Sequence, residues 1–377
     1  MSKIVHLSTV HEAIDNRILH KECRSLAEHG YDVTLIAQHP GDEELLGVKV
    51  VGLKPPTGRI QRLSRTIVKA VWKALKTHPD LVHFHDPELM LAAPVFRLLR
   101  IPVIYDVHED YVTSIRDKSY LGWFRFPLSL AIALLEWITR RYCHVIIAER
   151  SYKSRFANGT MVLNYPRSFP AQPESACSPA TDGPPRVLFT GGIHPNRGAL
   201  NHAKLVNLHP DLEVHLVGRI EDATKQQLLD EVGDSHQRLV LDGGQQLVPF
   251  EQIIARYGEG NWIAGLAIFH RSADHYGKEL TKFFEYMSAG IPILCSDFPV
   301  WRSLVEKHEC GICVDPDNPQ EMQEAVEFLA THPKEVSRMS ANGRAAAGQY
   351  TWNSQADKMV RLYASILDPD PSPIAMP

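Results

Sequence analysis

The chain has 377 residues, which is more than one hydrophobic core usually serves, so two domains are expected. Apolar residues make up 44% of the sequence, enough to fill two cores. The net charge of -4 argues against a broad basic surface for nucleic acid, so any anion-binding site must be local.

The first half alternates short apolar runs with amphipathic stretches. The predicted strands are residues 4–8, 31–37, 48–53, 81–84 and 103–105, and the predicted helices are residues 18–27, 67–75 and 89–99. Such alternation is typical of a parallel sheet with helices on both faces. The chain runs directly into its first strand, so no signal peptide is expected, and its scattered cysteines fit a reducing cytoplasm.

Polar side chains follow three of these strands, at the edge where a parallel sheet binds its ligands. They are His11, Asp15, Asn16 and Arg17, then His85, Asp86 and Glu88, then Asp106, His108, Glu109 and Asp110. A single histidine there is equally well explained by capping or packing, but three clusters favour a site. We predict that His108 and Glu109 touch a reacting group, because a histidine and a carboxylate can exchange protons.

Residues 118–147 are strongly apolar and flanked by arginines. The uninterrupted run is shorter than the roughly 20 residues that span a bilayer. Two interpretations stay open. The stretch is either a buried core helix, or a membrane-surface contact made through Trp123, Phe124, Arg125 and Phe126.

Residues 166–185 are rich in Pro, Ser and Ala, which predicts an interdomain linker. A second alternating series follows. Its predicted strands are residues 186–190, 214–217, 239–241 and 265–269, and its predicted helices are residues 200–208, 224–232 and 250–257. The second half is therefore also predicted to be α/β.

The stretch from Gly277 to residue 299 contains a predicted phosphate site. Thr281 is a predicted N-cap, and Lys282 places a cation in the first helical turn, where the helix dipole is already positive. That arrangement predicts an anionic ligand. Glu285 shares the helix face of Lys282 and could bind hydroxyl groups of the same ligand, although an ordinary surface ion pair has the same spacing.

The loop after the first strand of the second half contains Gly191, Gly192 and Arg197. Two glycines allow close backbone approach, and the arginine precedes a helix. Because both loops open on one edge of a parallel sheet, Arg197 and Lys282 are predicted to surround one diphosphate. The C-x-x-C spacing of Cys310 and Cys313 lacks further ligands in order, so no metal site is predicted.

Over nearly its whole length the sequence resembles the GT-B glycosyltransferases of family 4, also called glycosyl transferases group 1, of the bacterial polysaccharide-biosynthesis type. The motifs that carry the resemblance are Lys282-Phe-Phe-Glu285-Tyr-Met-Ser-Ala-Gly290-Ile-Pro292, then Cys310-Gly311-Ile-Cys-Val-Asp315-Pro316, Gly191-Gly192 with Arg197-Gly198, and Thr351-Trp352. The resemblance implies an α/β fold in which two Rossmann-like parallel-sheet domains face each other across a cleft. The corresponding segments are an acceptor-side domain (1–165), a linker (166–185), a donor domain (186–350), and a final segment (351–377) whose helix crosses back to the first domain.

The resemblance also implies roles for individual residues. Glu285 would bind the ribose of a nucleotide sugar, Arg197 and Lys282 would neutralise its diphosphate, and His108 would lie near the transferred sugar. The predicted phosphate-binding and donor residues are Gly191, Gly192, Arg197, Arg271, Gly277, Leu280, Thr281 and Lys282. Gln245 is the predicted base contact, and Asp15, Arg17, Asp86 and Glu88 are predicted on the acceptor side. Two positions depart from the family pattern: Gly277 replaces a frequent Glu, and Gly192 replaces a frequent Arg.

The predicted function is a retaining, metal-independent glycosyltransferase without a cofactor, whose donor is a UDP- or GDP-sugar. The predicted acceptor is a saccharide or lipid-linked saccharide, and the location is the cytoplasm or the inner face of the cell membrane, with peripheral membrane contact. Two alternatives are a sugar-nucleotide epimerase of the same architecture and a non-catalytic sugar-nucleotide-binding partner subunit. The sequence determines neither the base, the sugar, the acceptor nor the oligomeric state.

Overall fold

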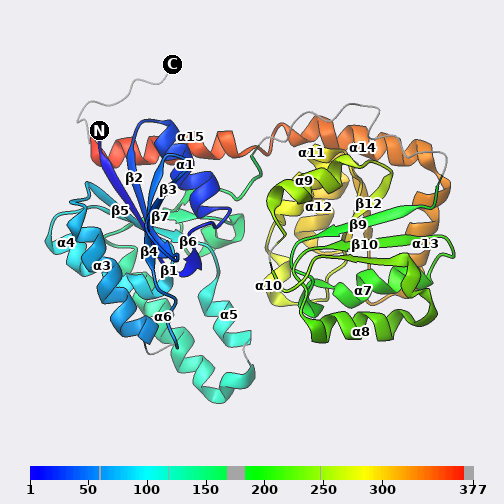
Figure 1. Cartoon of the computed structure of the whole chain (residues 1–377), viewed down its shortest axis with the longest axis horizontal. Coiled ribbons are helices and arrows are strands. Elements are labelled where there is room, and N and C mark those ends of the chain that lie inside the picture. Colours follow the sequence, from blue (N-terminus) through cyan, green and yellow to red (C-terminus); the bar gives the residue numbers. More distant parts are fainter. Residues whose placement is uncertain (59–60, 118, 168–182, 247, 369–377) are drawn as a thin grey trace. The chain divides into compact units, whose positions relative to one another are not determined.

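The computed structural model describes residues 1–58, 61–117, 119–167, 183–246 and 248–368 (Figure 1). The chain forms two compact units. Unit 1 comprises Met1–Asn164 with the segment that begins at Trp352, and unit 2 comprises Tyr165–Thr351. Most of the predicted linker, residues 168–182, lies outside the described residues.

Unit 1 is built on an eight-stranded sheet of order β3-β4-β2-β1-β5-β6-β7-β8. Its strands are β1 (Lys3–Glu12), β2 (Asp32–Gln38), β3 (Glu43–Leu45), β4 (Val48–Leu53), β5 (Leu81–Phe84), β6 (Val103–Val107), β7 (His144–Ile147) and β8 (Thr160–Met161). All neighbouring strands are parallel except β3, which pairs antiparallel with β4. The predicted parallel sheet is confirmed. The predicted end of the first strand is wrong, because β1 continues to Glu12 and pairs there with Gln38.

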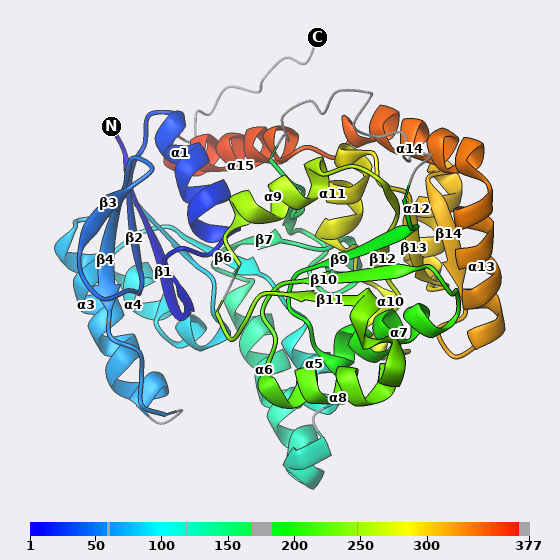
Figure 2. The same cartoon turned by 45° about the vertical axis from the view of Figure 1, so that its right-hand side comes forward.

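Helices cover both faces of this sheet (Figures 1 and 2). One face carries the π-helical turn η1 (Ile18–Cys23), α1 (Arg24–Glu28) and α15 (Trp352–Leu367). The other face carries α3 (Ile67–Lys76) and α4 (Ala93–Leu98). The pair α5 (Tyr111–Asp117) and α6 (Arg125–Thr139) projects away from the sheet in both views.

The C-terminal helix α15 belongs to unit 1, as the sequence predicts. Trp352, Met359 and Tyr363 are fully buried in the core between α15, α1 and the sheet. The indole Nε1 of Trp352 donates to Ser25 Oγ at 2.8 Å. The last helix therefore completes the core of the first unit, where it places a tyrosine behind the central strands.

Unit 2 has a six-stranded, fully parallel sheet of order β11-β10-β9-β12-β13-β14. Its strands are β9 (Arg186–Thr190), β10 (Glu213–Val217), β11 (Leu239–Asp242), β12 (Trp262–Ala267), β13 (Ile293–Ser296) and β14 (Gly311–Val314). Its helices are α7 (Ala199–Lys204), α8 (Asp222–Val232), α9 (Phe250–Gly258), α10 (Ala273–Tyr276), α11 (Thr281–Ala289), α12 (Pro299–His308), α13 (Pro319–Thr331) and α14 (Pro333–Ala347). Figure 1 shows α7 and α8 on one face of the sheet and α11 and α12 on the other.

Each sheet reverses its strand order beside its first strand. In unit 1, β1 lies between β2 and β5, and in unit 2, β9 lies between β10 and β12. Loops that leave neighbouring parallel strands toward opposite faces open a crevice at their carboxyl ends, where α/β proteins bind ligands. The candidate site residues of both units follow these central strands.

Candidate functional site

In unit 2, two cations meet at the loop after β9. Lys282, at the start of α11, donates from Nζ to the carbonyl oxygen of Thr190 at 2.5 Å. The same ammonium lies 3.7 Å from the ring centroid of Phe189. A Cβ atom at Gly191 would lie 3.7 Å from Lys282 Nζ. The loop and the helix start, far apart in sequence, are thus brought together as expected.

The second cation of this cluster is Arg197. A Cβ atom at Gly192 would lie 3.4 Å from its Nη1 atom, so the guanidinium lies against the two-glycine loop. Burial and the nearby Arg197 lower the pKa of Lys282 to about 7, although Glu285 acts in the opposite direction. The two cations therefore repel each other in a partly buried site, and a bound anion would compensate their charge.

The amino terminus of α11 adds to this positive potential. Its N-cap is Leu280, with extended backbone angles (φ -89°, ψ 126°), and its first turn contains no acidic residue. The prediction that Thr281 is the N-cap is wrong, because Thr281 is already the first helical residue. The N-cap residue Leu280 makes no side-chain capping hydrogen bond, and in this sense the helix end is uncapped. Its positive end is therefore not neutralised by the helix itself.

Glu285 lies one turn further along α11 and is held by a short hydrogen-bond chain. The hydroxyl of Tyr257 on α9 donates to Glu285 Oε2 at 2.9 Å and lies 2.7 Å from Thr190 Oγ1. Sequence reasoning missed Tyr257, because a tyrosine in a helix is usually a packing residue. Its hydroxyl fixes the carboxylate that the sequence predicts to bind a ribose.

Three other predicted donor residues have different surroundings. Arg271 pairs with Asp315 at 2.7 Å and with Asp317 at 3.1 Å, so its charge is balanced by the loop after β14. Gln245 is exposed and donates to Asp222 Oδ2 at 2.7 Å. Gly277 is the C-cap of α10. Arg271 and Gln245 therefore have partners other than the Arg197 and Lys282 cluster.

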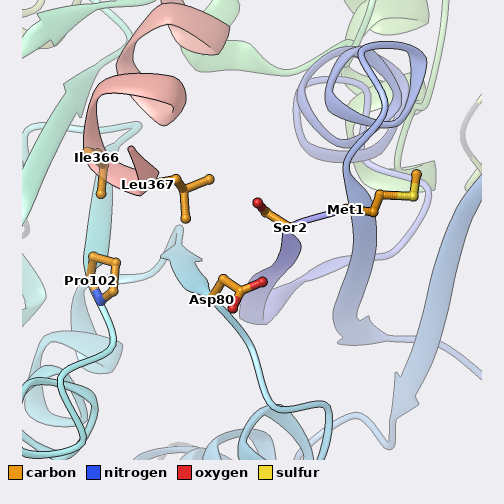
Figure 3. Close-up of a pocket in the computed structure, with 6 residues that line it drawn as sticks. All are labelled: Met1, Ser2, Asp80, Pro102, Ile366 and Leu367. Atoms are coloured by element: carbon orange, nitrogen blue, oxygen red, sulfur yellow. The ribbon is translucent and has the colours of Figure 1, made fainter. Parts of the chain in front are cut away.

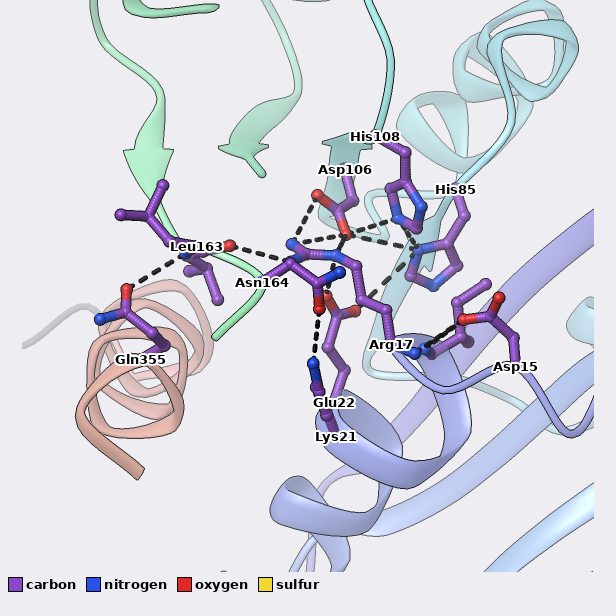
Figure 4. A network of polar contacts seen from close by, with 12 residues as sticks. Asp15, Arg17, Lys21, Glu22, His85, Asp106, His108, Leu163, Asn164 and Gln355 are labelled. Carbon is purple, nitrogen blue, oxygen red and sulfur yellow. Dashed lines mark hydrogen bonds and ion pairs between the residues drawn. The ribbon is translucent and has the colours of Figure 1, made fainter. Parts of the chain in front are cut away.

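In unit 1, Arg17 is the centre of a buried polar network (Figure 4). Its guanidinium donates to both carboxylate oxygens of Asp106 at 3.2 Å, and to the Val162 carbonyl oxygen at 3.0 Å. Its Nε also lies 2.9 Å from Glu22 Oε1. Arg17 is 6% exposed and the two carboxylates are fully buried, so this predicted acceptor-side residue serves internal contacts.

One guanidinium thus faces two buried carboxylates, and their pKa values separate. Burial alone would raise the pKa of Asp106, but Arg17 and His108 hold it well below its usual range. Burial and the neighbouring Asp106 charge raise the pKa of Glu22 well above its usual range, despite Arg17. Asp106 is therefore the ionised member, and Glu22 holds a proton more readily.

His108 contacts Asp106 and His85 rather than Glu109. Its Nε2 atom lies 2.8 Å from Asp106 Oδ2 and 3.1 Å from His85 Nδ1. Glu109 is exposed. The carboxylate that pairs with His108 is therefore that of Asp106, which lies on β6. The predicted pairing of His108 with Glu109 is not seen.

The remaining predicted acceptor-side carboxylates act as internal supports. Asp15 Oδ1 accepts from the backbone N–H of Arg17 at 2.8 Å. Asp86 is 1% exposed and accepts from Thr9 N at 2.6 Å. Glu88 is ion-paired with Arg62 at 2.9 Å. These contacts brace the loops at the carboxyl ends of β1 and β5.

Of the three histidines behind His108, His85 was named in the polar cluster after the predicted strand 81–84, whereas His6 and His83 were not predicted as site residues. His6 on β1, His83 on β5 and His85 directly after it are all fully buried on the same face of the sheet. A sequence signal existed, because histidines two residues apart in an apolar strand must share a face. Sequence alone could not show that Tyr363, 280 residues later, packs against that face.

Two groups of residues in this network have metal-ligand chemistry. One is His6, Glu22, His83 and His85, and the other is His85, Asp106 and His108. The Arg17 cation already neutralises Asp106 and faces Glu22, and most of the imidazole nitrogens are hydrogen-bonded either to one another or to the hydroxyl of Tyr363. Such donors suit a hydrogen-bond network better than a second cation. The predicted metal-free site stays a prediction.

The hollow in Figure 3 lies away from both clusters. It is lined by Met1, Ser2, Asp80, Pro102, Ile366 and Leu367. These residues lie around the amino ends of β1, β5 and β6. In a parallel sheet that edge is opposite the ligand-binding edge, so this hollow is a poor candidate for an active site.

The apolar stretch around α6 is exposed. Trp123, Phe124, Phe126 and Leu130 are 57–68% exposed, whereas the buried residues of α6 are the polar Ser129, Glu136 and Thr139. The stretch Leu121–Thr139 is long and apolar enough to cross a membrane by length and composition, and 11% of it is buried. The interpretation as a buried core helix is therefore wrong.

Two units, each built on a parallel sheet with helices on both faces, define a two-domain α/β architecture, and comparison with known proteins shows that it is that of a glycosyltransferase. The model of Glycosyltransferase Family 4 matches residues 16–158, and that of Glycosyl transferases group 1 matches residues 174–346. Together they cover most of the chain. The chain therefore belongs to glycosyltransferase family 4 and has the GT-B fold.

Individual relatives are distant. A phosphatidyl-myo-inositol mannosyltransferase of Mycobacterium tuberculosis is 26% identical over 76% of this chain and 74% of its own length. The sucrose-phosphate synthase structure from Thermosynechococcus elongatus has a TM-score of 0.75 at 16% identity, covering 98% of this chain and 100% of that one. The Anabaena HepE structure in complex with UDP-glucose has a TM-score of 0.70 at 13% identity, covering 97% of this chain and 100% of that one.

We expect Gly198→Ala to destabilise unit 2 strongly. Gly198 has φ +71°, and a Cβ atom there would lie 1.8 Å from the carbonyl oxygen of Ile268, so the end of β12 would have to move. The matched control is Gly233→Ala, which has φ +56° with no atom within 4 Å. The control should lose about 1 kcal/mol from backbone strain, and Gly198→Ala roughly 3 kcal/mol or more, in urea unfolding. Equal losses would contradict the close approach of the loop to β12.

Proposed function

We propose that this protein is a retaining glycosyltransferase that moves a sugar from a nucleoside diphosphate sugar to a saccharide or lipid-linked saccharide. The observation that carries the proposal is the cluster of Lys282, Arg197 and the uncapped α11 amino terminus around the two-glycine loop. This cluster has more positive than negative charge and backbone that a ligand can approach closely. A diphosphate matches it in charge and size.

The cluster is suited to the step in which the sugar leaves. As the bond between the anomeric carbon and the diphosphate breaks, negative charge grows on the diphosphate. Fixed cations and a helix amino terminus stabilise that charge, an effect commonly worth several kcal/mol. In this proposal the chain's own cations do the work that a divalent metal does in other diphosphate sites, so transfer needs no added metal.

The other residues take roles around this step. Glu285, oriented by the hydroxyl of Tyr257, binds the ribose hydroxyls, and Gln245 contacts the base. Unit 1 supplies His108, whose ring is held by Asp106, to the transfer step. The acceptor hydroxyl forms a bond to the anomeric carbon as the bond to the diphosphate breaks, its proton passes to His108, and the new bond has the configuration of the old one.

The relatives guide the choice of donor and acceptor. The mycobacterial relatives are named phosphatidyl-myo-inositol mannosyltransferases. A GDP-mannose:cellobiosyl-diphosphopolyprenol alpha-mannosyltransferase of Komagataeibacter xylinus is 31% identical over 22% of this chain and 21% of its own length. Both names state transfer of a mannosyl group and contain a lipid-borne compound, and the second names GDP-mannose, so GDP-mannose and a lipid-linked acceptor are the first pair to test.

The α6 surface supports an acceptor in a membrane. Its aromatic side chains face outward, and two arginines lie over them: Arg125 is 5.0 Å from the Phe126 ring and Arg141 is 4.0 Å from the Trp137 ring. Apolar side chains bordered by cations fit the surface of an anionic bilayer. We propose that α6 rests on the cytoplasmic face of the cell membrane and brings the enzyme to its acceptor.

Transfer should depend on both donor and acceptor. Incubation with labelled GDP-mannose or UDP-glucose and lipid-linked saccharides should release nucleoside diphosphate only when an acceptor is present, and NMR of the product should show a retained anomeric configuration. A chelator should leave the rate unchanged. Isomerised donor formed without acceptor would indicate an epimerase, and nucleotide binding without turnover for every pair would indicate a non-catalytic subunit; either result would end the transferase proposal.

Nucleoside diphosphate binding should weaken as the pH rises above 7. The pKa of Lys282 in the empty site is about 7, so above that pH the ammonium must regain a proton to pair with the diphosphate. Uptake of one proton weakens binding by up to about tenfold per pH unit. Titration calorimetry between pH 7.5 and 9.0, in buffers of different ionisation enthalpy, should show proton uptake approaching one per nucleotide.

The matched variant for this test is Lys282→Arg. A guanidinium stays charged over the whole range, so the variant should bind with little pH dependence and take up no proton. If the wild-type protein binds GDP and UDP equally well at pH 7.5 and 9.0, then Lys282 does not contact the diphosphate.

Trp123→Ala should weaken binding to anionic vesicles by roughly tenfold, since a buried aromatic side chain is worth about 1.5–3 kcal/mol. The matched control is Trp72→Ala, because Trp72 is also exposed (55%) but lies on α3. Vesicle co-sedimentation at low salt measures the difference. Wild-type protein that does not bind such vesicles, or equal losses in both variants, would rule out α6 as the membrane contact.

A further inference from the structure

A continuous chain of hydrogen bonds connects His108 with the C-terminal helix. His108 Nε2 lies 3.1 Å from His85 Nδ1, and His85 Nε2 lies 3.0 Å from His6 Nδ1. His6 Nε2 lies 3.2 Å from the Tyr363 hydroxyl, which lies 2.6 Å from His83 Nδ1. Both ring nitrogens of two successive histidines are thus used in one line of contacts.

The three inner rings are neutral at neutral pH. Burial lowers the pKa of His85 to about 4, and burial lowers the pKa values of His6 and His83 well below their usual range. A neutral imidazole has one N–H donor and one acceptor nitrogen, and a hydroxyl has one donor. A chain of such groups must therefore run in a single direction, with every donor pointing the same way.

The far end of the chain selects that direction. His83 Nε2 is buried without a hydrogen-bond partner among the described residues, and it lies 3.9 Å from Asp106 Oδ2. An N–H that points toward this carboxylate is favoured over a lone pair. His83 then accepts at Nδ1 from the Tyr363 hydroxyl.

The remaining protons follow from this assignment. Tyr363 accepts from His6 Nε2–H, His6 accepts from His85 Nε2–H, and His85 Nδ1 is left as an acceptor beside His108. The His108 Nε2–H then donates to Asp106 Oδ2 at 2.8 Å. His85 Nδ1 also lies 3.5 Å from Asp106 Oδ2, but His108 Nε2 is nearer to this oxygen, at 2.8 Å, and is the donor to it. The His108 Nε2–H therefore also faces the lone pair of His85 Nδ1, which agrees with the direction that the far end selects.

We propose that Tyr363 on α15 is a positioning residue for His108. Through His6 and His85 it fixes the ring proton on Nε2, which leaves Nδ1 as the nitrogen that accepts a proton from a reacting group. The mechanistic use of this nitrogen rests on the transferase function proposed above, whereas the proton assignment does not. The helix that returns to unit 1 thereby contributes to the state of the predicted reactive histidine as well as to the core.

The test is the tautomer of His108, measured by nitrogen-15 NMR on the full-length protein with labelled histidine. In the wild type, His108 should be in the Nε2–H form. In Tyr363→Phe both hydrogen bonds of the hydroxyl are lost, and His85 becomes free to donate toward Asp106 from Nδ1. The ratio of the two His108 tautomers should fall roughly fivefold. This is the effect expected when the one hydrogen bond that His6 Nε2–H donates to the hydroxyl no longer fixes the direction of the chain.

Two further variants separate this role from a general effect on stability. His83→Asn keeps an acceptor oxygen near the position of Nδ1, so the Tyr363 hydroxyl keeps its direction and the His108 tautomer should be retained. Tyr350→Phe removes the hydroxyl of another histidine–tyrosine pair, His308 Nε2 to Tyr350 at 2.7 Å in unit 2, and should also leave His108 unchanged.

An unchanged tautomer in folded Tyr363→Phe would overturn the proposal. A stoichiometric transition metal in the purified protein would also overturn it, because the same nitrogens would then be ligands. If transfer is measured, Tyr363→Phe should lower kcat several-fold with KM unchanged. A tautomer shift in a protein without transferase activity would support the positioning role of Tyr363 and contradict the proposed function.

Discussion

In unit 1 the guanidinium of Arg17 is hydrogen-bonded to Asp106 and ion-paired with Glu22, and both carboxylates are fully buried. One cation cannot compensate two buried negative charges, so Asp106 ionises and Glu22 tends to keep its proton. The ionised Asp106 then orients His108. The same guanidinium binds the Val162 carbonyl oxygen, which is close to where the chain leaves unit 1. This ion pair therefore sets both the local fold and the charge around the predicted reactive histidine.

Unit 2 has the reverse imbalance. Two cations, Lys282 and Arg197, lie beside an uncapped helix amino terminus, and Glu285 is the carboxylate that acts on Lys282. Burial and the neighbouring Arg197 charge lower the pKa of Lys282 in the empty site. An anion removes that penalty. At the same edge of a parallel sheet, unit 1 thus holds a buried hydrogen-bond network, and unit 2 has the excess positive charge that we propose binds a diphosphate.

The sequence predicted the features that depend on local pattern. The alternation of strands and helices indicated two parallel sheets. The return of α15 to unit 1, which the family resemblance implied, is confirmed, and Met359 and Tyr363 are buried in that core. The approach of Lys282 to the Gly191 loop also followed, since loops after neighbouring parallel strands open on one edge. Local rules misplaced the N-cap of α11 and the end of β1, because caps and strand ends depend on partners outside the local sequence.

Sequence by itself determined the family, the sheet class and the residues available at each strand end, because these follow from side-chain periodicity and motif spacing. Only the tertiary structure decided which of these side chains contact each other. It paired His108 with Asp106 rather than with the exposed Glu109, directed Arg17 inward, turned the apolar face of α6 outward, and brought Tyr363 within 2.6 Å of His83. Hydrogen bonds act over about 3 Å. The distance between two residues in the sequence does not reveal whether they come that close, because this depends on how the strands pair.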